Sequence, residues 1–130
     1  MVVEYIRYNV SSKERRDELV GVYRHAAMAL DQAPECVAYE LSVCEEDETS
    51  AMLRIEWQST EAHLQGFRKS AVFGEFFRAI SGFVKEIAEM RHYQLSNVSR
   101  AFASMQIVRP THREVPTTAS NRKREPPYWD

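Results

Sequence analysis

Apolar and polar residues alternate with a period of two in two stretches of the first half of the chain, and an earlier stretch, residues 2–10, carries β-branched and aromatic residues on both faces. Successive side chains of a β-strand point to opposite faces of the sheet, so these patterns predict strands over residues 2–10, 36–44 and 50–57. A less regular stretch over residues 83–95 predicts a fourth strand. The acidic residues 45–48 lie between the second and third stretches and predict a solvated hairpin turn.

Helical spacing dominates between the first two strands. Ser11 and Glu14 have the spacing of a capping box, which predicts a helix that begins there and ends near Gln32. Pro34 prevents the helix from continuing past Ala33. The apolar stripe of this helix consists of Leu19, Val22, Tyr23, Ala26 and Leu30.

A second helical region follows the third strand. Ser59 is a plausible N-cap for a short helix that carries His63 and Phe67. A further helix is predicted from about Ser70 to a stop at Gly82. Its apolar positions are Phe73, Phe76, Phe77 and Ile80. Together with Trp57 at the end of the third strand, these side chains predict an aromatic pocket with few polar groups.

The order β-α-β-β-α-β, with right-handed crossovers and one short hairpin, predicts an α+β, ferredoxin-like antiparallel sheet. The first and third strands are expected at its centre and the helices on one face. We expect the other face to carry a mixture of apolar and charged residues: Glu4, Ile6, Tyr8, Glu40, Arg54 and Glu56. Packing against an identical sheet would bury this mixture and pair its charges, so the pattern predicts a homodimer.

Composition divides the 130 residues into a domain over 1–95 and a Pro/Arg-rich C-terminal extension over 96–130 that is expected to be partly disordered. The domain has a net charge of −5 and the extension +3. The overall charge of −2 gives no support for binding nucleic acid or a membrane surface. Apolar residues at the start of the extension are expected to dock on the domain or on the partner subunit: Val98, Phe102, Met105, Ile107 and Val108.

Cys36 and Cys44 lie on one predicted strand, about 26 Å apart at full extension, so they cannot pair with each other within it. Two unpaired thiols are typical of a reduced, cytoplasmic protein. No signal-peptide pattern or long apolar run is present, and the spacing around the cysteines predicts no metal site.

Four segments in this order resemble the antibiotic biosynthesis monooxygenase family, whose members are dimeric α+β barrels. They are VVEYIRY from Val2, CVAYEL from Cys36, RIEWQSTEAHLQGF from Arg54 and EMRHY from Glu89. The most specific piece is the turn Glu56-Trp57-x-Ser59, and the resemblance covers about residues 2–95.

The resemblance implies a monooxygenase that uses no cofactor and oxidises an aromatic, quinol or polyketide-type small molecule with dioxygen. The haem-degrading branch of the family uses a histidine on the last helix as the iron ligand. The last predicted helix here contains no histidine, which argues against haem. The alternative function is a non-catalytic dimeric module of the same fold that binds a hydrophobic small molecule or a partner protein.

The candidate catalytic residues are His63, Tyr5 and Trp57. An imidazole has an unperturbed pKa of about 6.5, which suits proton transfer near neutrality. His63 is expected to be partly exposed on its helix, where its imidazole can lean over the mouth of the pocket or point into solvent. Tyr5 is expected to face Ile55 and Trp57, so that its phenol enters the pocket, whereas Trp57 forms a wall or packs as an ordinary core residue.

Further residues are expected to contact the substrate: Arg7, Tyr39, Phe67, Phe73 and Phe77. Arg7 could stabilise an enolate or form an ion pair at the strand end, and the phenylalanines belong first of all to the core. His92 is expected to be structural or to face the dimer interface, and His25 and His112 to be exposed.

Overall fold

A computed structural model of the chain describes residues 1–100. Its elements follow the order β1 (Val2–Asn9), α1 (Lys13–Asp31), β2 (Cys36–Val43), β3 (Ser50–Trp57), η1 (Ala62–Gly66), η2 (Phe67–Lys69), α2 (Ala71–Ile80), η3 (Ser81–Glu86) and β4 (Ile87–Gln94). The strands form one sheet in the order β2-β3-β1-β4, and each neighbouring pair is antiparallel. The predicted ferredoxin-like α+β fold, with β1 and β3 at the centre, is confirmed.

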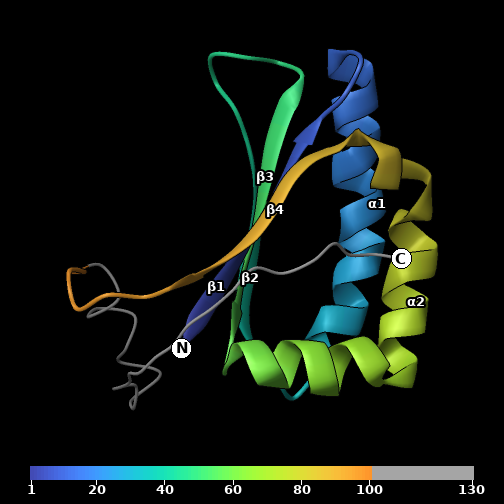
Figure 1. Cartoon of the computed structure of the whole chain (residues 1–130). Helices are drawn as coiled ribbons and strands as arrows, with labels where there is room; N and C mark the ends of the chain where they lie inside the picture. Colours follow the sequence, from blue (N-terminus) through green and yellow to red (C-terminus); the bar gives the residue numbers. More distant parts are fainter. Residues whose placement is uncertain (101–130) are drawn as a thin grey trace.

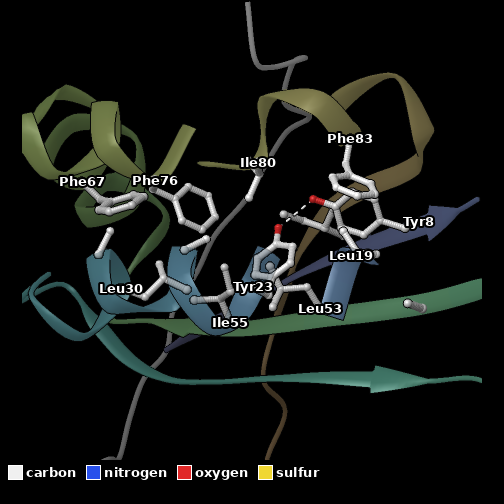
Figure 2. Packing of buried hydrophobic residues seen from close by; sticks show 14 of the residues in the cluster. Tyr8, Leu19, Tyr23, Leu30, Leu53, Ile55, Phe67, Phe76, Ile80 and Phe83 are labelled. Carbon is white, nitrogen blue, oxygen red and sulfur yellow. Dashed lines mark hydrogen bonds between the residues drawn. The ribbon is translucent and has the colours of Figure 1, made fainter. Parts of the chain in front are cut away.

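The helices α1 and α2 lie side by side on one face of the sheet, and the segment that contains η1 and η2 runs across one end of it (Figure 1). The core fills the space between these two layers. It combines the inward residues of β1 and β3 with the apolar stripe of α1 and with Phe67, Phe76 and Ile80. Figure 2 shows Phe67 and Phe76 above Leu30 and Ile55, so aromatic rings from the second helical region close the core.

A hydrogen bond between two tyrosines lies inside this core. The hydroxyl groups of Tyr8 on β1 and Tyr23 on α1 are 2.7 Å apart (Figure 2). Burial raises the pKa of both phenols, so both hydroxyls keep their protons and one can donate to the other. Each hydroxyl therefore has a partner, which makes its burial tolerable.

The faces of β1 are the reverse of the sequence expectation. Glu4, Ile6 and Tyr8 are buried on the face that packs against the helices. The prediction that they lie on the helix-free face is wrong, whereas Glu40, Arg54 and Glu56 do belong to that face by register. Both faces of β1 carry charged and apolar residues, so alternation alone could not orient the strand.

The helix-free face carries apolar, aromatic and charged side chains from all four strands. From β1 it takes Val3, Tyr5 and Arg7, which pair with Glu56, Arg54 and Met52 of β3 and with Tyr93, Arg91 and Glu89 of β4. Arg54 contacts Glu56 at 3.0 Å and Glu40 at 3.7 Å. The expected mixture of apolar and charged groups is therefore present on this face, but it comes from a different set of β1 residues.

The last strand begins later than expected, at Ile87, because residues 81–86 form the 3₁₀ helix η3. Arg15 of α1 explains this local structure. Its guanidinium lies 3.8 Å from the ring centroid of Phe83, donates to the carbonyl of Gly82 at 2.9 Å and bonds Glu86. These long-range contacts hold the segment in a turn that local alternation does not indicate.

The expected docking of the C-terminal extension lies largely outside the described residues. Phe102, Met105, Ile107 and Val108 belong to the part of the chain beyond residue 100. Val98 is described and is 85% exposed, so it does not dock on the domain. The boundary of the extension at residue 96 stays a prediction.

The N-terminus of α1 gives a test of local structure. The N-cap is Ser12, whose hydroxyl accepts a hydrogen bond from the backbone N–H of Arg15 at 3.0 Å, and not Ser11 as the capping-box pattern predicts. Ser12→Ala should lower the free energy of unfolding by about 1 kcal/mol, because it leaves that N–H without its acceptor. Ser11→Ala is the matched control and should change little. Urea unfolding of both variants checks this, and an equal loss in both would contradict the assignment.

Candidate active site

His63 is held in a buried position by an unusual turn. After β3 ends at Trp57, the hydroxyl of Ser59 accepts from the N–H of Ala62 at 2.9 Å, and the Ser59 carbonyl accepts from the N–H of His63 at 3.1 Å. Residues Ala62–Gly66 then form the π-helical turn η1. His63 is only 2% exposed, so the expectation of a partly exposed helical histidine is wrong. π-turns occur often at functional sites.

Trp57 and His63 form a stacked pair. The ring centroids are 4.3 Å apart and the planes differ by 9°. The indole is fully buried, and its Nε1–H donates to Oε1 of Glu4 at 3.0 Å. Trp57 therefore fixes both the plane of the imidazole and the position of a buried carboxylate.

His92 of β4 completes the group. It is the register partner of Glu4 on the neighbouring strand, and its Nε2 lies 2.8 Å from Nδ1 of His63. The other ring nitrogen of His63, Nε2, lies 3.6 Å from Oε1 of Glu4. We call Glu4, Trp57, His63 and His92 the histidine cluster; it joins four side chains from β1, β3, η1 and β4.

Both imidazoles are neutral near neutral pH. Burial lowers the pKa of His63 well below its usual value, helped by the neighbouring His92 and the positive charge of Arg68. Burial, followed by Arg68, lowers the pKa of His92 to about 4. The contact between His63 and Glu4 is therefore not an ion pair at neutral pH.

The geometry favours one arrangement of the protons. If Nε2 of His63 carries its proton, that N–H points toward the Glu4 oxygen, and Nδ1 accepts from Nε2–H of His92. The opposite tautomer would place a lone pair of His63 against the carboxylate oxygen, which is unfavourable when Glu4 is ionised. In the favoured arrangement Nδ1 of His92, the less buried ring, carries a lone pair and no proton.

Tyr5 and Arg7 lie on the opposite face of the sheet. Tyr5 pairs with Arg54 in the register of β1 and β3, and its ring packs edge-on against Tyr93 at 5.5 Å. Arg7 lies 3.7 Å from Glu89. The expectation that Tyr5 shares a face with Ile55 and Trp57 is wrong, because Glu4 and not Tyr5 is the register partner of Ile55.

The other predicted residues lie on the helix side of the sheet. Phe67 is buried, with its ring centroid 4.9 Å from that of Trp57. The centroid of Phe73 lies 5.5 Å from that of Phe67, and the centroid of Phe77 lies 5.9 Å from that of Phe73, so the rings form a row. Tyr39 donates its hydroxyl to Asp31 at 2.7 Å, and this bond is the main reason why the pKa of Tyr39 rises to about 12. His63, Trp57 and the phenylalanines thus come together as expected, and Tyr39 is tied to α1.

Sequence reasoning did not select Glu4 and His92 for the site. Glu4 shares its strand face with Ile6 and Tyr8, which are apolar or aromatic. A charged residue among such neighbours is the signal in the sequence that could have indicated a buried carboxylate. His92 follows Met90 on the corresponding face of β4. Their meeting depends on the pairing of β1 with β4, which residue spacing does not reveal.

Three members of the cluster carry groups that ligate metals. Taking one donor atom from each of Glu4, His63 and His92, all three atoms lie within 4.8 Å of one another. Two imidazoles and a carboxylate are a common donor set for divalent transition metals. Linear spacing could not reveal this set, because its members are separated by 59 and 29 positions.

A ferredoxin-like sheet with a hydrogen-bonded pair of histidines at one end defines the class of fold and site. Comparison with known proteins gives the family: residues 1–79 match the antibiotic biosynthesis monooxygenase profile, and the chain belongs to this family. The uncharacterized protein YczJ of Bacillus subtilis is 27% identical over 77 residues, which cover 59% of this chain and 81% of YczJ.

Solved structures share the fold at low sequence identity. A conserved protein of Methanosarcina mazei has a TM-score of 0.60 and 17% identity, with 73% of this chain and 92% of that chain covered. SnoaB, described as a cofactor-independent oxygenase of Streptomyces nogalater, has a TM-score of 0.56 and 14% identity, with 76% and 94% covered. Within residues 1–100, no helix combines the length and apolar character that crossing a bilayer requires.

The histidine pair should make stability depend on pH. Between pH 6.5 and about 4, the unfolded chain binds protons at His63 and His92 that the folded chain does not, so stability falls as the pH is lowered through this window. Each such proton contributes a slope of about 1.4 kcal/mol per pH unit. For metal-free protein, His92→Gln should reduce the slope by about one proton, measured by urea unfolding across the window.

Tyr93→Phe is the control for this measurement, because Tyr93 neighbours His92 but belongs to the other face of β4. It should leave the slope unchanged. The same slope in the wild type and in His92→Gln would contradict the burial of a neutral imidazole pair.

Proposed function

We propose that the protein oxidises an electron-rich aromatic small molecule, such as a phenol, quinol or anthrone, with dioxygen. The observation that carries this proposal is the part-buried hydrogen bond between His63 and His92 beside the stacked Trp57. Membership of the family and the fold shared with the oxygenase SnoaB support it. Because the substrate supplies the electrons, this reaction needs no redox cofactor.

The chemistry balances without a further reductant. For an anthrone-type substrate, a ring CH₂ group loses two hydrogens and gains one oxygen atom to become a carbonyl. The second oxygen atom leaves as water, so the substrate loses four electrons and dioxygen gains them. The step that the protein must assist is removal of a proton from the substrate, because the resulting anion gives up an electron far more readily.

In this proposal the histidine pair accepts that proton. His92 is the less buried ring and carries the nitrogen that accepts the proton. His63 holds His92 in position through their hydrogen bond, and the carboxylate of Glu4 lies next to His63 on the other side of its ring. Because the imidazole of His92 is neutral, it can accept the substrate's proton without first losing a proton of its own. Trp57 and Phe67 form the apolar wall behind the pair, and Phe73 and Phe77 extend it.

The packing around Trp57 supports the alternative, a non-catalytic module of the same fold. Trp57 is fully buried, with His63 stacked on its ring and Phe67 beside it. In this arrangement the indole is covered by the protein's own side chains. A module that binds a hydrophobic molecule or a partner protein would bind without consuming oxygen, so oxygen uptake distinguishes the two functions.

Substitution of either histidine tests the catalytic proposal. His92→Ala and His63→Ala should each lower the turnover number by ~10² to 10⁴, the usual effect of removing a general base or disabling it. Oxygen uptake by the pure protein on a panel of quinols and anthrones measures this, and labelled dioxygen identifies the oxygen in the product. Trp57→Phe should mainly weaken substrate binding, because it loosens the wall.

His25→Ala on α1 is the control and should retain full activity. Circular dichroism of each variant separates loss of chemistry from loss of fold, which matters for the buried His63. Full turnover in both His63→Ala and His92→Ala would place the base elsewhere. Substrate binding without oxygen uptake by the wild type would favour the module.

We also propose that two copies of the chain pack through the helix-free face of the sheet. Tyr93 is 50% exposed there with its ring against Tyr5, and the same face carries the ion pair of Arg54 and Glu40 on β3 and β2. Exposed aromatic rings among fixed charges are typical of a surface that is covered in an assembly. A stable interface of this kind buries about 1,600 Å² in total.

Light scattering tests this dimer. The wild type should have the mass of two chains at micromolar concentration. Tyr93→Glu should shift the equilibrium toward single chains, because it places a negative charge in the interface with no positive charge positioned to pair with it. Met28→Glu is the matched control: Met28 is 55% exposed, but it lies on α1. A single-chain mass for the wild type would contradict the proposal, and so would an equal effect of both substitutions.

A further inference from the structure

We propose that Glu4, His63 and His92 form a binding site for one divalent transition-metal ion, with Zn²⁺ as the simplest occupant. Their donor atoms, one from each residue, lie within 4.8 Å of one another. Glu4 and His63 are buried, and His92 is half-buried. The inference does not rest on the proposed oxidation, because metal binding is measured without substrate.

Small movements would bring the three donor atoms to the separations that an ion requires. Zinc bonds of about 2.0–2.1 Å in a tetrahedral arrangement place neighbouring donor atoms about 3.3 Å apart, and the three donor atoms here lie within 4.8 Å of one another. His63 contacts His92 through Nδ1 at 2.8 Å and Glu4 through Nε2 at 3.6 Å, so these two contacts use different nitrogens of one ring. One nitrogen of each ring can bind a single ion, so a rotation of His92 has to bring its donor toward the other two. His92 belongs to β4, an edge strand, where such a movement displaces little of the core.

The surroundings of the three donors are those of an oriented ligand set. The indole N–H of Trp57 holds Oε1 of Glu4 at 3.0 Å, and the indole ring fixes the plane of His63 by stacking. In metal sites, partners of this second layer set the orientation of the ligands and strengthen binding. Trp57 therefore supports the site without binding the ion itself.

The charges allow an ion to replace the shared proton. A metal binds a ring nitrogen through its lone pair, and the two rings already share one proton between Nδ1 of His63 and Nε2 of His92. Glu4 supplies a negative charge when ionised, whereas the nearby Arg68 opposes a second cation. Three protein ligands leave a fourth position for water or for an oxygen of a ligand such as a phenolate, which is the arrangement of reactive zinc sites.

Titration of the metal-free protein tests the site. After removal of metals with a chelator, Zn²⁺ should bind with one ion per chain in calorimetry, and Co²⁺ should give visible d–d absorption of a nitrogen and oxygen ligand set. Glu4→Gln and His92→Gln should each weaken binding by at least about tenfold, since even loss of an outer-layer partner costs 10- to 100-fold. Zn²⁺ should raise the melting temperature of the wild type but not of His92→Gln.

A background variant removes other potential ligands. Cys44 lies beside Glu46, with its Sγ 3.6 Å from a carboxylate oxygen, and His25 is on α1. Cys44→Ser combined with His25→Gln should keep the affinity and the stoichiometry of the wild type. The proposal is overturned if the metal-free wild type shows no saturable binding. Unchanged affinity in both Glu4→Gln and His92→Gln, each shown to be folded by circular dichroism, overturns it as well.

Discussion

The hydrogen bond from Trp57 to Glu4 is the interaction on which the site depends. A carboxylate on a central strand, facing the helices, is costly to bury unless donors meet it. The indole of Trp57 at the end of β3 supplies one donor, and the same ring supplies the flat surface on which His63 stacks. Because β1 is the neighbour of β4, the strand that carries Glu4 also brings His92 to the same end of the sheet. The polar group and the aromatic wall are thus one assembly.

The succession of elements was predictable from the sequence because it depends on local period. Alternation in β3 and the Phe-rich stripe of α2 each describe one face of one element, and the structure has both as expected. The orientation of β1 was not predictable in this way. Glu4 and Tyr8 carry polar groups and were therefore expected on the face that a second copy covers, but a tryptophan and a tyrosine from other elements bond them in the core. The predicted start of β4 was wrong for a similar reason, because Arg15 of α1 bonds Gly82 and Glu86 and so holds the residues before the strand in a turn.

The site was predictable only in part, and the reason is geometrical. His63 and Trp57 are close in sequence, so a short capped turn was enough to connect them. The direction of His63 depends on the π-turn of η1, whose wider coil rotates the following side chains relative to an α-helix. Sequence left the imidazole free to lean over the pocket or to point into solvent, and η1 turns it inward. His92 reaches the site only because β4 pairs with β1, and its contact with His63 joins residues 29 positions apart in the sequence.

The two uses proposed for the histidine cluster draw on the same electron pairs. A proton shared between His63 and His92 and an ion bound by both rings compete for nitrogen lone pairs of the same two imidazoles. Burial acts in one direction on both, because it removes the competing bulk protons from the imidazoles by lowering their pKa. Arg68 places a positive charge near both rings, and Glu4 places a carboxylate beside His63. The buried indole of Trp57 holds that carboxylate in place, so the same interaction positions Glu4 for either occupant of the cluster.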